Sequence, residues 1–109
     1  MIKLILFIVS MAFTCVTLAS EISGTKVTRT MMDATYGLVL FVQVEGSPDR
    51  TNCHSNSMWD YVLATDSELG KQMLSKLMAA HASNRTVKIK GNDTCPVGST
   101  EAMTRLEIY

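Results

Sequence analysis

Residues 38–44 read LVLFVQV and are apolar at every position except Gln43. In an extended strand, successive side chains point to opposite faces of the sheet, so both faces of this segment are apolar. Such a strand needs cover on both sides, because exposing apolar surface to water is unfavourable. We therefore expect residues 38–44 to form a central strand, and its composition favours a closed barrel over an open sheet.

Two more strands are predicted next to this segment. Residues 26–32 (KVTRTMM) are rich in β-branched and apolar side chains, which indicates a strand. Residues 33–37 (DATYG) have the length and the glycine of a hairpin turn. Residues 58–64 (MWDYVLA) alternate as a third strand. The apolar face of that strand would hold Trp59, Tyr61 and Leu63.

A helix is predicted after residue 64. Thr65 and Glu68 have the spacing of a capping box, and Asp66 is the alternative N-cap. The helix should end at residues 83–84, where Ser and Asn follow the apolar periodicity. Its apolar stripe would consist of Leu69, Met73, Leu74, Leu77, Met78 and Ala80.

Two strands are predicted after the helix. Residues 86–90 (TVKIK) alternate, and residues 103–109 (MTRLEIY) should point Leu106 and Ile108 inward. The predicted fold is mainly β with one helix, in the order β-β-β-α-β-β. This is the order of the OB-fold, a five-stranded Greek-key barrel. A helix layered on an open antiparallel sheet would give the same order.

The first nineteen residues have the pattern of a signal peptide. A short, positively charged N-terminal region with Lys3 precedes an apolar run over residues 4–16. Residues 17–19 (TLA) place small side chains at the −3 and −1 positions that signal peptidase recognises. We expect cleavage after Ala19, with cleavage one position later as the alternative, and this leaves residues 20–109 as one secreted or periplasmic domain. The apolar run is too short to cross a hydrocarbon core of ~30 Å. Lipidation at Cys15 is the alternative.

Charge and cysteine content narrow the class of protein further. Without Lys3, nine Lys and Arg stand against ten Asp and Glu, a formal charge of −1. This balance argues against a nucleic-acid partner, which requires a basic surface. In an exported chain the pair Cys53 and Cys95 predicts a disulfide, with two free thiols as the alternative.

The motifs of catalysis and metal binding are weak. His54 and His81 read as solvated or helix-end side chains, and Cys53-His54 lacks the spacing of a zinc site. Residues 23–26 (SGTK) match a serine–lysine motif that needs a larger helical domain. We therefore expect no enzyme activity, no cofactor and no metal.

A binding function is favoured by the positions of loops and aromatic residues. Residues 33–37 and the loop around Cys95 join strand pairs, and the binding groove of OB-folds lies among such loops. Tyr36, Trp59 and Tyr61 offer stacking surface, with burial in the core as the alternative for the last two.

Several short motifs resemble a known family. The helix segment 70–75 (GKQMLS), residues 79–81 (AAH), residues 86–89 (TVKI), the Ser23-Gly24 pair and residues 44–46 (VEG) resemble the B subunit of subtilase cytotoxin and its small bacterial relatives. The resemblance implies a secreted OB-fold protein that assembles as a ring pentamer and binds glycans. Ser23 matches the serine of the family's glycan site, and Gly91 stands where the family has a tyrosine.

Two functions follow as expectations. The first is a secreted, non-enzymatic domain that binds a glycan, with Ser23, Glu45 and Tyr36 as the candidate glycan-binding residues. Such a domain could form a homo-oligomer, which would be a pentamer if the protein is toxin-like. The second is a monomeric periplasmic structural or inhibitory protein that binds a host protein or another protein through its loops. Neither includes a membrane span in the mature chain.

Overall fold

A computed structural model of the chain describes residues 19–109, so the predicted signal peptide lies outside the described residues apart from Ala19. Within this range the chain forms six strands, one α-helix and one short 3-10 helix. In chain order they are β1 (Glu21–Thr25), β2 (Val27–Met31), η1 (Ala34–Tyr36), β3 (Val39–Val44), β4 (Tyr61–Ala64), α1 (Glu68–Ala82), β5 (Val87–Gly91) and β6 (Met103–Ile108).

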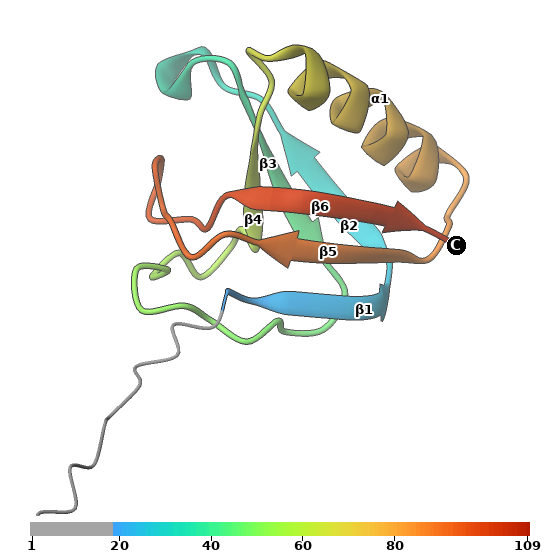
Figure 1. Ribbon diagram of the computed structural model, residues 1–109, viewed down its shortest axis with the longest axis horizontal. Coiled ribbons are helices and arrows are strands. Elements are labelled where there is room, and N and C mark those ends of the chain that lie inside the picture. Colours follow the sequence, from blue (N-terminus) through green and yellow to red (C-terminus); the bar gives the residue numbers. More distant parts are fainter. Residues whose placement is uncertain (1–18) are drawn as a thin grey trace, which may run out of the picture.

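The strands make two three-stranded sheets instead of one closed barrel. One sheet has the order β1-β5-β6 and the other has the order β2-β3-β4, and all of these neighbours are antiparallel (Figure 1). The sheets meet at a single parallel bridge between Val62 and Ala102. Beyond it, a hollow of about 220 Å³ between β4 and β6 is lined partly by Met73 of α1. The prediction of a closed barrel is wrong, because helix side chains line the space where β4 and β6 would have to pair.

The prediction of five strands is also wrong, because the first strand extends further and is divided. Residues 21–31 run through β1 and β2 with a break at Lys26, and each half joins a different sheet (Figure 1). The pairing register shifts on both sides of the break, between Ile22 and Thr25 and between Val27 and Arg29. Such irregularities bend a strand, and here they carry it from one sheet into the other.

The central position of β3 is confirmed. It pairs with β2 on one side and with β4 on the other. Leu40, Val42 and Val44 enter the main core between the two sheets, whereas Phe41 packs in a second cluster on the opposite face. Both faces of β3 are therefore covered, as its composition requires.

The main core joins both sheets and the helix. α1 contacts β2, β4 and β6, and it closes the side of the core between the sheets (Figure 1). The buried members are Val27, Leu40, Val42, Val44, Tyr61, Leu63, Met73, Leu77, Ala80, Val87, Ile89 and Met103.

The helix begins later than predicted. Its N-cap is Ser67, whose side chain accepts a hydrogen bond from the Gly70 backbone N–H at 3.0 Å, so neither Thr65 nor Asp66 caps it. Gly70 is needed here because a Cβ atom would overlap the carbonyl oxygen of Ala64. Leu69 was expected in the apolar stripe but is 65 % exposed.

Two details of the strands differ from the prediction. Residues 58–60 are not extended strand, because the Asn56 Oδ1 atom accepts hydrogen bonds from the backbone N–H groups of Met58 and Trp59. Trp59 therefore packs in the second cluster and not beside Tyr61. In β6, Ile108 was expected to point inward but is exposed.

Candidate functional site

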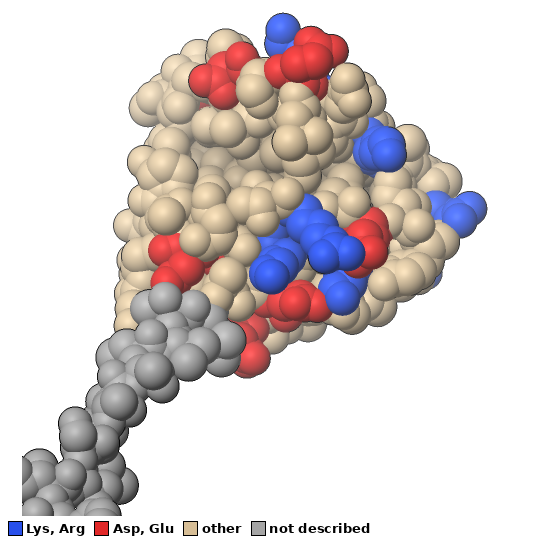
Figure 2. Space-filling model, viewed as in Figure 1, with Lys and Arg blue, Asp and Glu red and all other residues tan. Residues whose placement is uncertain are grey.

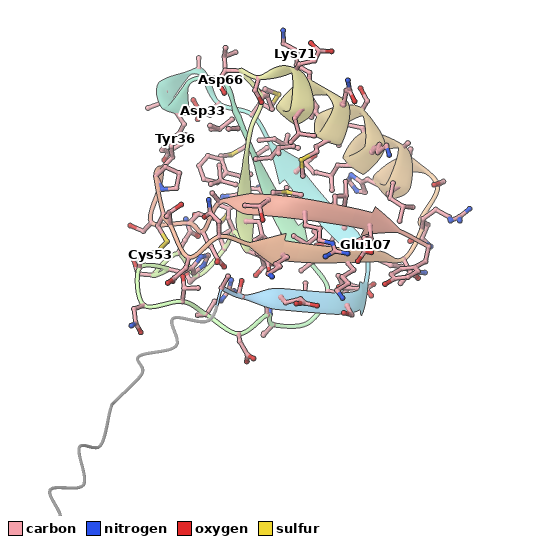
Figure 3. All side chains as sticks on the ribbon, viewed as in Figure 1. Asp33, Tyr36, Cys53, Asp66, Lys71 and Glu107 are labelled. Atoms are coloured by element: carbon pink, nitrogen blue, oxygen red, sulfur yellow. A yellow bond between two sulfur atoms is a disulfide. The ribbon has the colours of Figure 1, made fainter. Side chains whose placement is uncertain are left out.

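The three predicted glycan residues do not form one site. Ser23 lies on β1 and Glu45 follows β3; both are exposed. Their segments are adjacent, because Thr25 Oγ1 donates a hydrogen bond to the Glu45 carbonyl oxygen at 2.7 Å. Tyr36 lies in η1 at the opposite end of the β2–β3 hairpin, where Figure 3 labels it. Within residues 19–109, no hydrogen bond joins the side chains of any two of the three.

Tyr36 is held in place by its own turn and by a neighbouring ring. The Asp33 side chain caps η1 by accepting a hydrogen bond from the Thr35 N–H at 2.9 Å, and this bond lowers the pKa of Asp33. Gly37 ends the turn with a φ of 81°, in the region that favours glycine. The Tyr36 ring meets the Phe41 ring edge to face at 5.0 Å, yet Tyr36 remains 42 % exposed.

The aromatic contacts continue across the outer face of the β2-β3-β4 sheet. Phe41 and Trp59 lie 5.9 Å apart between ring centroids, and the Arg29 guanidinium lies 5.1 Å above the Trp59 ring. A cation in this position is attracted by the electron-rich ring face. We call Tyr36, Phe41, Trp59 and Arg29 the aromatic strip.

Exposed apolar side chains border the aromatic strip. Met58 lies at one end, where its sulfur is 3.7 Å from Arg29 Nη1 and its carbonyl oxygen accepts a hydrogen bond from Gln43 Nε2 at 3.0 Å. Met32 and Leu38 flank η1 at the other end, and all three are exposed.

Only Tyr36 and Arg29 of the strip are accessible, because Phe41 and Trp59 are buried. The alternative of burial in the core is therefore correct for Trp59 and Tyr61, and the accessible surface consists of one ring, one guanidinium and the apolar edges.

Two loops cover the rest of this sheet face. The predicted disulfide between Cys53 and Cys95 is confirmed, with the Cα atoms 5.8 Å apart, and it joins the loop before β4 to the loop before β6. Figure 3 labels Cys53 on the same side of the molecule as Tyr36. Asn56 Nδ2 donates a hydrogen bond to the Gly98 carbonyl oxygen at 3.0 Å, which adds a second link between the loops.

Gly98 lies in the loop before β6 and brings the backbone of this loop into contact with the aromatic strip. A Cβ atom at this position would lie 3.1 and 3.2 Å from two atoms of the Phe41 ring. Its φ of 59° is also one that L side chains rarely adopt. The covered side of Phe41 is therefore fixed by the backbone of this loop.

His54 also joins the two loops, and the expectation of a solvated side chain is wrong. It is 8 % exposed, its Nδ1 atom accepts a hydrogen bond from the Glu101 backbone N–H at 3.0 Å, and its Nε2 atom lies 2.9 Å from the Asn56 carbonyl oxygen. These partners assign the neutral ring with the proton on Nε2. Burial lowers the pKa of His54, and the positive charge of Arg50 lowers it further.

A buried polar cluster lies beside His54. Glu101 and Ser20 are 1 % and 5 % exposed, and the Ser20 hydroxyl donates to Glu101 Oε1 and lies 3.0 Å from the Tyr61 hydroxyl. Burial raises the pKa of Tyr61 to about 12, so its hydroxyl stays protonated. Sequence patterns did not predict this cluster, because its members come from three distant segments with no shared motif.

Within residues 19–109, no group of three or more His, Cys, Asp and Glu side chains is arranged to hold a metal ion. In the same range, no helix is both long and apolar enough to span a membrane. Comparison of the chain with family models, with curated proteins and with solved structures finds no match.

Proposed function

We propose that this chain is a secreted, non-enzymatic binding domain that recognises a glycan at the aromatic strip. The observation that carries the proposal is the Tyr36 ring, exposed to solvent and held edge-on by Phe41. Aromatic rings bind the apolar faces of ligands with little loss of side-chain entropy, and neighbouring polar groups orient the ligand. Arg29 and Gln43 supply donors on the same face.

The connectivity of the strands supports the same proposal. A first strand divided between two sheets and a parallel bridge between β4 and β6 are compatible with the OB-fold connectivity, although the barrel is open. OB-folds commonly bind oligosaccharides and oligonucleotides through the face and loops around their second and third strands. Because β1 and β2 together take the place of the first OB-fold strand, its second and third strands correspond to β3 and β4. Of the aromatic strip, Phe41 lies on β3, Trp59 in the segment before β4, Arg29 on β2 and Tyr36 in η1 between β2 and β3.

The test is a glycan array with matched tyrosine variants. Tyr36→Ala should weaken binding about tenfold or more, because the stacking ring is lost. Tyr109→Ala removes a more exposed ring at the C-terminus and should leave binding unchanged. Loss of binding in Ser23→Ala alone would move the site to β1, and an array without any signal for the wild type would refute glycan binding.

A protein partner is the second candidate function. Met32, Leu38 and Met58 are exposed around the strip, and Met, Tyr and Arg are enriched in protein interfaces. Native mass spectrometry at micromolar concentration separates the possibilities for self-association. A ring of several copies supports the toxin-like expectation, whereas a monomer with no glycan signal favours a different protein as the partner.

A further inference from the structure

Glu101 is a carboxylate in the interior of the protein. It is 1 % exposed, and both of its oxygens have partners: Ser20 donates from its hydroxyl and from its backbone N at 3.2 Å, and the Asp93 N–H donates at 2.8 Å. The Gly91 backbone packs directly against the carboxyl group, because a Cβ atom on Gly91 would overlap it. Since the side chain is almost wholly removed from water, the groups in contact with it must balance its charge.

None of the side chains around Glu101 supplies that charge. The four salt bridges within residues 19–109 do not include Glu101, and Arg50, whose charge acts on His54 and Tyr61, is paired with Asp60 at 2.7 Å. Tyr61 is neutral, and the His54 ring accepts a hydrogen bond from the Glu101 backbone. A buried carboxylate without a cation is costly, since the protein interior solvates charge poorly.

We propose that cleavage of the Ala19–Ser20 peptide bond creates this cation, and that the new α-ammonium of Ser20 forms a buried ion pair with Glu101. The inference depends on the export in the proposed function but not on the glycan. A signal peptidase, a hydrolase of the exporting membrane, adds water across the bond. The hydroxyl goes to the Ala19 carbonyl and a proton to the Ser20 nitrogen, which takes up a second proton at neutral pH.

The position of Ser20 agrees with a docking role for the new terminus. Its carbonyl oxygen accepts a hydrogen bond from the Gly91 N–H at 2.9 Å, directly before the pairing of Glu21 with Lys90. The ion pair would therefore set the register of β1 at the edge of its sheet. Before cleavage the same nitrogen is an amide, which donates a hydrogen bond but carries no charge.

The test compares proteins that differ only at the N-terminus. The forms are the chain starting at Ser20, the same chain with Nα-acetylation, and a chain extended by Ala19, each with and without Glu101→Gln. In the wild-type background, acetylation and extension should each lower the melting temperature by about 5 °C. In the Glu101→Gln background the three forms should melt together. Equal melting temperatures in the wild-type background would overturn the proposal.

Two further measurements keep the test decisive if Glu101→Gln folds poorly. The intact mass of the exported protein should correspond to a start at Ser20, and a start at any other residue refutes the proposal. A free α-amino group titrates near ~7.7, and pairing with a carboxylate raises this pKa. The advantage of the Ser20 form over the acetylated form should therefore be full below pH ~7.7 and decline at higher pH.

The titratable groups around Ser20 and Glu101 would not cause the same loss of stability above pH ~7.7. Burial raises the pKa of Tyr61 to about 12 and lowers the pKa of His54 below its ordinary value, and Arg50 is paired with Asp60. A constant difference between the two forms from pH 6 to 10 would contradict the ion pair. Loss of glycan binding with an intact melting difference would refute the proposed ligand but not this inference.

Discussion

The outer faces of the two sheets differ in the side chains that they carry: one is charged and the other is aromatic. On the β1-β5-β6 sheet, Lys88 lies 2.8 Å from Glu21 and 3.9 Å from Glu107, and Arg105 lies 3.1 Å from Glu107. Figure 2 shows Lys, Arg, Asp and Glu side chains mixed over this side of the molecule. On the β2-β3-β4 sheet, the outer face carries Phe41 and Trp59 instead.

The difference explains where the loops and the disulfide lie. The charged face is solvated and its charges are balanced, so it needs no cover. The aromatic face must be shielded, and the two loops joined by Cys53 and Cys95 shield part of it. The part that they leave open, around Tyr36, is the candidate binding surface.

Removing the disulfide should have the largest effect on stability, and it should loosen the loops that cover the aromatic face first. Replacing Cys53 and Cys95 by Ser frees a loop of 42 residues, which costs about 4 kcal/mol of unfolding free energy in the chain-entropy model. Urea denaturation measures the loss. Hydrogen exchange should increase in residues 92–101 before it increases in β5 and β6, and uniform acceleration would contradict the separation of the two faces.

Gly98→Ala should have the second largest effect. The new methyl group meets the Phe41 ring and the backbone keeps an unfavourable φ, so we expect a loss of about 2–3 kcal/mol in urea denaturation. Gly24→Ala is the matched control on β1, with a similar φ of 65° but open space around the Cβ position. Its cost should be about 1 kcal/mol, and equal costs at both positions would show that Phe41 is not closely covered.

His54, which joins the two disulfide-linked loops, should make the stability of the protein decrease in acid. Its pKa is below the ordinary value near ~6.5 in the folded protein, so the unfolded chain binds the proton first and stability falls as pH drops below ~6.5. His54→Asn keeps a hydrogen-bond acceptor that does not titrate and should reduce this fall. His81→Asn, on the helix, is the control and should retain it.

Lys88→Ala should have the smallest effect. The Lys88–Glu21 hydrogen bond raises the pKa of Lys88 and lowers that of Glu21, but both side chains are reached by water, which screens their attraction. We expect no resolvable change in melting temperature at 150 mM salt. A large decrease would mean that the charged face contributes to stability as the aromatic face does.

Much of the fold could be predicted because its signals are local. The two-sided apolar run in β3, the alternation in β5 and the periodicity of α1 are properties of neighbouring residues. β1 was missed because it contains Ser23 and Gly24, which are poor strand formers. The start of the third predicted strand was wrong because Asn56, three residues upstream of Trp59, holds the backbone in a turn.

The candidate site was predictable only in part. Tyr36 was singled out because it is an aromatic residue in a predicted turn, and it is exposed. Trp59 was offered as stacking surface, but it is buried in the second cluster, as the alternative expected. Arg29 was missed because nothing in its neighbours indicates that it lies over Trp59. Ser20 and Glu101 are 81 residues apart, so their contact follows from the pairing of β1 with β5 and not from any local pattern.

The break at Lys26 has a consequence for the order in which the protein folds. β2 pairs with β3 across residues 32–38, and β3 pairs with β4 across residues 45–60, so all three strands of this sheet are available once residue 64 has been made. β1 must wait for β5, whose residue Lys90 pairs with Glu21. Long loops close more slowly than short ones because they lose more chain entropy. We therefore expect a folding intermediate with the aromatic sheet formed, and with residues 20–25 joining last as the strand that completes the protein.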